Sequence, residues 1–136
     1  MINTINKIDR EDLVIFLVDD QKITNFINKK LIEITGICKN VYDFTNPKTA
    51  LENLEIHQPS LILLDLNMPE INGWKFLERM EKYSTSADVI IVTSSTSTLD
   101  QEKAKSYSRV VNYYTKPLNK YIFHTLAEKY QKKMSS

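Results

Sequence analysis

Three short runs of consecutive apolar residues constrain the fold of this chain more than any other feature. They are Leu13–Val18, Leu61–Leu64 and Val89–Val92. Because no polar residue interrupts them, these runs are typical of strands buried on both faces, as in a parallel sheet covered by helices. Two weaker strands are predicted at Asn40–Phe44 and Arg109–Tyr114. The sequence therefore predicts a sheet of five strands.

Helical patterns separate the predicted strands. The first ends before Gly36, a typical stop signal, and is amphipathic, with apolar positions at Ile23, Phe26, Ile27, Leu31 and Ile34. The second begins at Asn46 and Pro47, because asparagine is a common N-cap and proline is favoured at the first helical position. The side chains expected to face inward from this second helix are Ala50, Leu51 and Leu54.

Three more helices complete the predicted order. One follows the turn at Asn72 and Gly73 and continues through Trp74, Leu77, Met80 and Glu81. Thr98 with Gln101 resembles a capping box that opens the fourth helix. The fifth helix has apolar positions at Ile122, Phe123, Leu126, Ala127 and Tyr130. Strands and helices thus alternate five times, which predicts an α/β fold with a doubly wound parallel sheet and helices on both faces.

Composition excludes several classes of function. The chain has 136 residues, enough for one domain, and its 18 basic and 17 acidic side chains give a net charge of +1. This balance predicts no attraction to nucleic acid or to an anionic membrane surface. No apolar run approaches the ~18 residues that a membrane span needs. The lone Cys38 cannot form an internal disulfide, so we expect a cytoplasmic protein.

Polar residues lie at or just past the ends of four of the predicted strands. Asp19 and Asp20 follow the first strand, Asp65 the third and Thr93 the fourth, while Lys116 lies just past the fifth. Because parallel strands end at one edge of the sheet, where α/β proteins bind ligands, we expect these side chains to converge. Three close carboxylates repel one another, so a cation belongs among them. A hard divalent ion with oxygen ligands, such as Mg²⁺, fits this set.

Four sequence segments carry a resemblance to a known family. They are FLVDD (Phe16–Asp20), LLDLNMPEINGW (Leu63–Trp74), IIVTSS (Ile90–Ser95) and YYTKPL (Tyr113–Leu118). With these segments the chain resembles the receiver domain of two-component response regulators. The resemblance implies a flavodoxin-like sheet of strand order 2-1-3-4-5 with five helices on two faces. We expect a short leader at residues 1–12 and a stand-alone receiver at residues 13–133, without an output domain.

The resemblance also implies a role for each polar residue at the sheet edge. Asp65 would accept a phosphoryl group as a carboxylate nucleophile. Asp20 and Asp65 would ligate Mg²⁺ by their side chains and Asn67 by its backbone carbonyl, and Asp19 would act partly through water. Lys116 would neutralise charge on the phosphoryl oxygens, as phosphoryl transfer requires. Asn67 and Ser95 would border the path of the water that hydrolyses the acyl phosphate.

Switching is expected to involve two further side chains. Thr93 would contact a phosphoryl oxygen through its hydroxyl, and Tyr113 would swing inward when Thr93 moves, while Tyr114 faces the other side of the strand. The bond before Pro117 is expected to be cis. The phosphodonor would be a sensor histidine kinase or a histidine phosphotransfer domain. A downstream protein would bind the face formed by the fourth helix, fifth strand and fifth helix, so the chain would not be an enzyme with an external substrate.

Other functions fit the residues less well. A calcium-binding loop starting at Asp65 would need glycine where Glu70 stands. A haloacid-dehalogenase-type phosphatase needs a second acid where the chain has Asn67. A flavodoxin-like electron carrier would have to place its cofactor phosphate against Asp19 and Asp20. A receiver fold that serves as an interaction module without phosphorylation remains the alternative.

Overall fold

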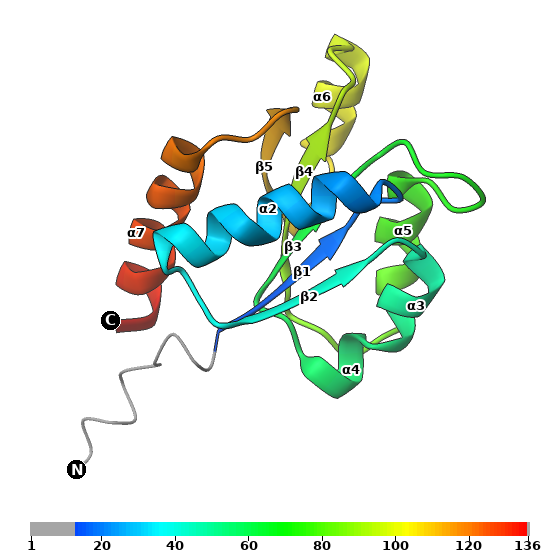
Figure 1. Ribbon diagram of the computed structural model, residues 1–136. Coiled ribbons are helices and arrows are strands. Elements are labelled where there is room, and N and C mark those ends of the chain that lie inside the picture. The colour runs from blue at the N-terminus through cyan, green and yellow to red at the C-terminus, as the bar shows by residue number, and fades with distance from the viewer. Residues whose placement is uncertain (1–12, 136) are drawn as a thin grey trace.

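The computed structural model describes residues 13–135 and contains one five-stranded parallel sheet (Figure 1). Its strands are β1 (Val14–Val18), β2 (Asn40–Phe44), β3 (Leu61–Leu64), β4 (Asp88–Thr93) and β5 (Val110–Thr115). They lie in the order β2-β1-β3-β4-β5, which confirms the predicted fold class and topology. The fifth strand lies one residue later than expected. Its register shifts beside Val89, where Val111 is an additional residue that forms a bulge.

Six helices, rather than the expected five, are present in the described residues. They are α2 (Lys22–Thr35), α3 (Pro47–Glu52), α4 (Leu54–His57), α5 (Gly73–Met80), α6 (Thr98–Ala104) and α7 (Lys120–Ser135). The additional helix arises because the predicted second helix is interrupted at Asn53. This residue has ψ −1° instead of a helical value, and its side-chain amide donates to the Thr49 carbonyl.

Most predicted helix ends are confirmed. The Asn46 side chain accepts a hydrogen bond from the Lys48 amide, and Gly36 has the left-handed conformation (φ 68°) that ends α2. The prediction for α6 was wrong by one residue. Its N-cap is Ser97, whose hydroxyl accepts from the Asp100 amide at 3.4 Å. Several hydroxyl side chains follow one another here, so the sequence alone does not show which one caps the helix.

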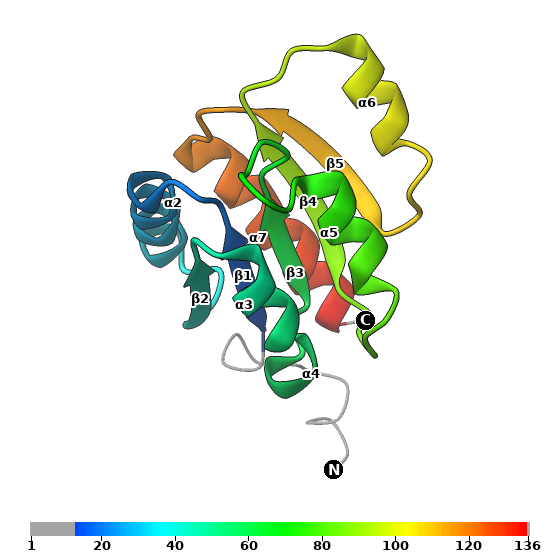
Figure 2. The ribbon, with the colours of Figure 1, turned by 90° about the vertical axis from the view of Figure 1, so that its right-hand side faces the viewer.

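Helices cover both faces of the sheet (Figure 2), so the side chains that alternate between the two faces along each strand are buried on either side. On one face, Ile15 and Leu17 pack with residues of α2 and α7. On the other, Phe16 and Val18 pack with residues of α3, α4, α5 and α6. Val18 pairs with Leu64 across the sheet, so the residues that follow β1 and β3 emerge side by side. No helix among residues 13–135 combines the length and apolar character that crossing a bilayer requires.

Helix α2 is oriented in an unexpected way. Its periodicity predicted the helix, but the apolar face lies in solvent: Phe26 is 57% exposed and Ile34 is 66% exposed. The buried face carries Ile32 together with Asn25 and Asn28. The amide of Asn25 donates to the carbonyls of Asp19 (3.0 Å) and Phe44 (3.2 Å). These hydrogen bonds satisfy the amide nitrogen of Asn25, whereas its side-chain oxygen is buried without a hydrogen-bond partner among the described residues.

Candidate functional site

Three carboxylates converge where β1 and β3 end. Asp19 and Asp20 follow β1, Asp65 follows β3, and one carboxylate oxygen of each lies within 4.8 Å of the others. Backbone hydrogen bonds hold both chain segments, because the Asp65 amide donates to the Val18 carbonyl at 3.0 Å and the Asp19 amide to the Phe44 carbonyl at 3.1 Å. Asp19 and Asp65 are buried, and Asp20 is half-buried. The predicted acidic cluster is therefore present.

Lys116 reaches this cluster from the segment after β5. Its ammonium lies 2.6 Å from Asp19 Oδ2 and 3.3 Å from Asp65 Oδ2, so it bridges the two buried carboxylates. Burial alone would lower the pKa of the ammonium, but the hydrogen bonds and negative charges of Asp19 and Asp65 outweigh that effect and raise its pKa. Lys116 is thus held in its charged form. The peptide bond between Lys116 and Pro117 is cis.

The cluster retains unbalanced negative charge in spite of Lys116. Burial raises the pKa of Asp65, and the nearby charge of Asp19 raises it further, while Lys116 and the Asn67 amide only partly oppose the rise. The Lys116 ammonium lies closer to Asp19 than to Asp65, so it stabilises the negative charge of Asp65 less than that of Asp19. Three carboxylates with one ammonium form an oxygen-rich donor set that suits a hard divalent cation.

Thr93 lies at the end of β4 and is completely buried. Its hydroxyl oxygen accepts from the Asn67 side-chain amide and from the Ser95 backbone amide, both at 3.3 Å. Asn67 also donates its backbone N–H to Asp65 Oδ1 at 3.3 Å. Asn67 therefore links the Asp65 carboxylate to the Thr93 hydroxyl.

The two tyrosines of β5 face opposite sides of the sheet. Tyr113 packs against the cluster that includes residues of α5 and α6, and Tyr114 packs against the cluster beneath α2 and α7. The Tyr113 hydroxyl donates to the Ser95 carbonyl at 3.3 Å. Tyr113, the predicted switch aromatic, is half-buried in this structure and contacts the loop that leaves Thr93.

A tight approach of the backbone shapes the segment after Asp65. The Gly73 amide donates to the Leu66 carbonyl at 2.9 Å, which folds the segment back on itself. A Cβ atom on Gly73 would lie 2.8 Å from both the Asp65 carbonyl oxygen and the Leu66 Cα. Only glycine allows this approach without a backbone shift, so the start of α5 is packed directly against the residue that carries the central carboxylate.

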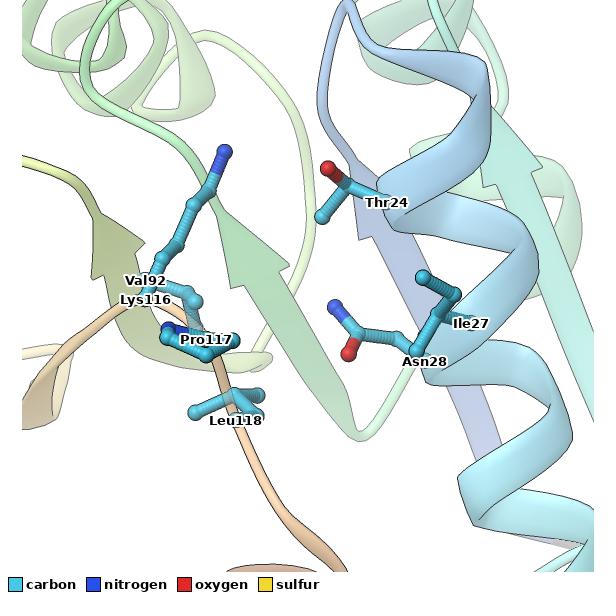
Figure 3. Close-up of a pocket in the computed structure, with 7 residues that line it drawn as sticks. All are labelled: Thr24, Ile27, Asn28, Val92, Lys116, Pro117 and Leu118. Atoms are coloured by element: carbon cyan, nitrogen blue, oxygen red, sulfur yellow. The ribbon is translucent and has the colours of Figure 1, made fainter.

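A pocket of about 210 Å³ adjoins the acidic cluster and shares Lys116 with it (Figure 3). It lies between α2 and the segment after β5, and its lining residues are Thr24, Ile27, Asn28, Val92, Lys116, Pro117 and Leu118. Figure 3 shows the Asn28 side chain extending from α2 toward Pro117. The roles of Asn28 and Asn25 could not be predicted, because buried asparagines do not differ from exposed ones in a single sequence.

One contact near Thr93 also escaped the sequence prediction. The Ser95 hydroxyl donates to Asp100 Oδ2 at 2.7 Å and so joins the loop after β4 to α6. The spacing of Ser97 and Asp100 in the sequence is typical of an N-cap followed by an acidic residue three positions later. This spacing would have placed Asp100 in the first turn of the helix, but it does not indicate Ser95 as its partner.

Comparison with known proteins identifies the family. The response regulator receiver domain model matches residues 15–128, which is most of the chain. The chain therefore belongs to the response regulator receiver domain family, a family of two-component signal transduction. Its parallel sheet and the carboxylates at the strand ends agree with this assignment.

Individual relatives differ in length and function. The chain is 34% identical over 84 residues to the protein-glutamate methylesterase/protein-glutamine glutaminase of Treponema denticola, covering 62% of this chain and 23% of that protein. It is 28% identical over 120 residues to the probable methanogenesis regulatory protein FilR2 of Methanothrix harundinacea, covering 82% of this chain and 77% of that protein. The chain thus spans less than a quarter of the Treponema denticola relative.

Solved structures show the same fold. A two-component response regulator from Cytophaga hutchinsonii is 29% identical with a TM-score of 0.78, covering 88% of this chain and 96% of that one. A CheY-like receiver domain protein from Methanospirillum hungatei is 24% identical with a TM-score of 0.73, covering 90% of this chain and 93% of that one. At 24% identity, the likeness to the Methanospirillum hungatei protein concerns the fold alone.

Proposed function

We propose that the chain is a phosphorylated switch or relay that accepts a phosphoryl group on Asp65. The donor is a phosphohistidine of a sensor histidine kinase or histidine phosphotransfer domain, and Mg²⁺ is required. One observation carries the proposal: the Lys116 ammonium bridges Asp65 and Asp19 beside a third carboxylate. An interaction module without phosphorylation would have no need to keep these charges together, because burying them is costly.

The chemistry follows from the positions of the side chains. An Asp65 carboxylate oxygen attacks the phosphorus atom and forms an acyl phosphate, while the nitrogen–phosphorus bond of the donor breaks and its electron pair stays on the imidazole. Lys116 neutralises the charge on the phosphoryl oxygens. The Thr93 hydroxyl, which Asn67 and Ser95 now contact, becomes a donor to one of these oxygens.

The donor set fits a magnesium ion. Asp20 and Asp65 would hold it by their side chains and Asn67 by its backbone carbonyl, and Asp19 would act partly through water. When bound, Mg²⁺ supplies positive charge that stabilises the oxygens of the transferring group. The repulsion that raises the pKa of Asp65 supports this assignment, because a cation among the carboxylates would relieve it.

Intact-mass measurement after incubation with acetyl phosphate and Mg²⁺ tests the proposal. We expect the mass of one phosphoryl group to be added, and hydroxylamine to remove it, because acyl phosphates are sensitive to that nucleophile. Asp65→Asn should abolish the addition, since an amide oxygen is a poor nucleophile. Chelation of Mg²⁺ should abolish it as well.

Asp43→Asn is a matched control, because Asp43 is an exposed carboxylate on β2 whose ion pair within the described part of the chain is with Lys29 at the surface. This variant should be labelled like the unmodified chain. Phosphorylation of Asp65→Asn to the normal extent would place the acceptor elsewhere and refute the proposal. Lys116→Ala should be labelled more slowly, because one charge that neutralises the phosphoryl oxygens is missing.

A further inference from the structure

Helices α3 and α5 lie side by side over one face of the sheet (Figure 1). A pocket of about 340 Å³ takes its lining from both helices and from the turn after α5, and this volume is within the range of small-molecule sites. The lining residues are Lys48, Leu51, Glu52, Arg79, Lys82 and Tyr83. Three of these side chains are cations and one is an anion, so the lining has two positive charges in excess. Because the whole chain carries only +1, positive charge is concentrated here.

Backbone hydrogen bonds fix the α5 side of this pocket. The Lys82 amide donates to the Arg79 carbonyl at 3.1 Å, and the Tyr83 amide donates to the Met80 carbonyl at 3.0 Å. The chain therefore continues to turn after α5 ends. Residues three and four positions apart in such a turn lie on the same side, so Arg79, Lys82 and Tyr83 line the pocket together.

The cations of the pocket are not neutralised by neighbouring acids. Within the part of the chain that the structure describes, neither Arg79 nor Lys82 forms an ion pair. Lys48 lies 3.7 Å from Glu70, but these side chains are 56% and 71% exposed, and such a surface pair contributes little. All three cations can therefore turn to an anion that enters the pocket.

Lys48 lies where its own helix does not favour a cation. It is the second residue of α3, whose first turn has no acidic residue, and the partial positive charge of a helix N-terminus repels an ammonium. Arg79, in contrast, lies in the last turn of α5, where a cation is favourable. The helix dipoles thus account for Arg79 but not for Lys48. An anionic ligand between the two helices accounts for both.

We propose that this pocket binds a nucleoside monophosphate. A phosphate monoester carries a charge of about −1.5 to −2 at neutral pH, which matches the two excess positive charges of the lining. A carboxylate would neutralise only one of them. The planar Arg79 guanidinium can hold two phosphate oxygens at once, and the ammoniums of Lys48 and Lys82 act as point charges beside it.

The remaining lining residues suit the base and the ribose. Leu51 is buried in the core cluster, and half-buried Tyr83 packs against the same cluster. Bases stack on aromatic side chains, so the base lies against Tyr83 and Leu51. The Glu52 carboxylate accepts a hydrogen bond from a ribose hydroxyl or from an amino group of the base. None of the lining residues belongs to the acidic cluster, so the inference is independent of phosphorylation at Asp65.

Amide chemical-shift titration of the unphosphorylated protein tests the proposal. The ligands are AMP, GMP, CMP and UMP, each compared with its nucleoside and with inorganic phosphate. Mg²⁺ is left out, and salt is kept at about 0.15 M to screen diffuse attraction. At least one nucleotide should shift the amides of α3 and of residues 79–83. It should bind at least about tenfold more tightly than inorganic phosphate, as expected for one stacked base.

Substitutions in the lining separate its parts. Arg79→Gln and Lys82→Gln should each weaken nucleotide binding about fivefold or more, because each removes a charged hydrogen-bond donor. Lys75→Gln is the matched control, since it removes an exposed cation one turn earlier on α5 that does not line the pocket, and should change binding by less than about twofold. Tyr83→Leu should weaken the binding of the nucleotide but not that of inorganic phosphate.

One substitution should strengthen binding. Glu52→Gln removes the negative charge of the lining and should tighten nucleotide binding by about two- to threefold. Damage to the fold cannot produce such a gain.

Three outcomes of these titrations would overturn the proposal. They are inorganic phosphate that binds as tightly as every nucleotide, shifts confined to the segments around Asp65, and a loss in Lys75→Gln as large as that in Arg79→Gln. A phosphoserine peptide that binds the same amides more tightly than any nucleotide would also overturn it, in favour of a protein partner.

Discussion

Helices α2 and α6 both stand beside the edge of the sheet that carries the carboxylates, yet they are held in opposite ways. Helix α2 has 14 residues and is joined to the ends of β1 and β2 through the buried Asn25 amide. Helix α6 has seven residues, buries only Ala104, and depends on the hydrogen bond of Asp100 and the contacts of Trp74. The first is anchored to the sheet backbone, and the second is attached by side chains.

This difference fits the proposed function, in which the site stays intact while the surface changes. The anchor of α2 holds the backbone of Asp19, so movement of α2 would disturb the acidic cluster itself. Among the described residues, the first turn of α6 reaches the carboxylates only indirectly, because Asp100 contacts Ser95, Ser95 contacts Thr93, and Asn67 joins Thr93 to Asp65. Two natural side chains can report on the environment of these helices. Cys38 lies in the cluster beneath α2, and the Trp74 ring contacts Lys103 of α6.

The largest expected effect that tests this comparison is the protection of the Cys38 thiol from alkylation in the folded protein. Burial raises the pKa of its thiol from 9.0 to about 11, because the thiolate is poorly solvated there. A rise of two pKa units lowers the thiolate fraction at pH 8 about a hundredfold. Alkylation of the native protein at pH 8, followed by intact mass, should be at least about a hundredfold slower than in urea. Rapid labelling of the native state would mean that the α2 side opens easily and would break the comparison.

Replacement of the α2 anchor should have the next largest effect. Asn25→Ala removes both side-chain donors and leaves the Asp19 carbonyl without this partner, which should lower the free energy of unfolding by about 2 kcal/mol. Urea denaturation measures the loss. Asn53→Ala is the control, since its amide also donates to a backbone carbonyl but at the surface, and it should cost well under half as much. An equal loss in free energy of unfolding for the two variants would mean that Asn25 holds α2 no more strongly than a hydrogen bond at the surface does.

The sheet and the acidic cluster could be predicted because simple local rules determine them. Uninterrupted apolar runs specify strands buried on both faces, and parallel strands bring residues such as Asp19 and Asp65 to one edge. The Asn46–Pro47 start of α3 was predictable for the same reason, because the cap and its proline are neighbours in sequence.

The features that could not be predicted depend on contacts between distant residues. Helical periodicity shows that α2 has two unlike faces, but not that the polar face is buried, since that depends on carbonyls at the ends of β1 and β2. The closer contact of Lys116 with Asp19 than with Asp65 also depends on packing. The break at Asn53 shows the limit even within one helix, because a single side chain that bonds to a nearby carbonyl interrupts it.

The smallest predicted effect concerns the outer face of α2. Phe26 is 57% exposed, and the Lys30 ammonium lies 5.6 Å from the centre of its ring, a contact that contributes little in solvent. Phe26→Gln should therefore change the free energy of unfolding by less than about 0.5 kcal/mol, because glutamine is a good helix former. Ile32→Ala on the buried face of the same helix should cost about 2–5 kcal/mol.

Urea denaturation at two protein concentrations separates the reasons for a different result. A loss above about 1 kcal/mol for Phe26→Gln at both concentrations would mean that another part of the chain covers this face. A loss that grows with concentration would mean that a second copy covers it. A small loss at both would establish that the apolar face of α2 is open in the folded chain, beside the pocket that shares Lys116 with the acidic cluster. The stability of α2 then comes from its buried side, which carries Asn25, Asn28 and Ile32 and which has no counterpart in α6, where only Ala104 is buried.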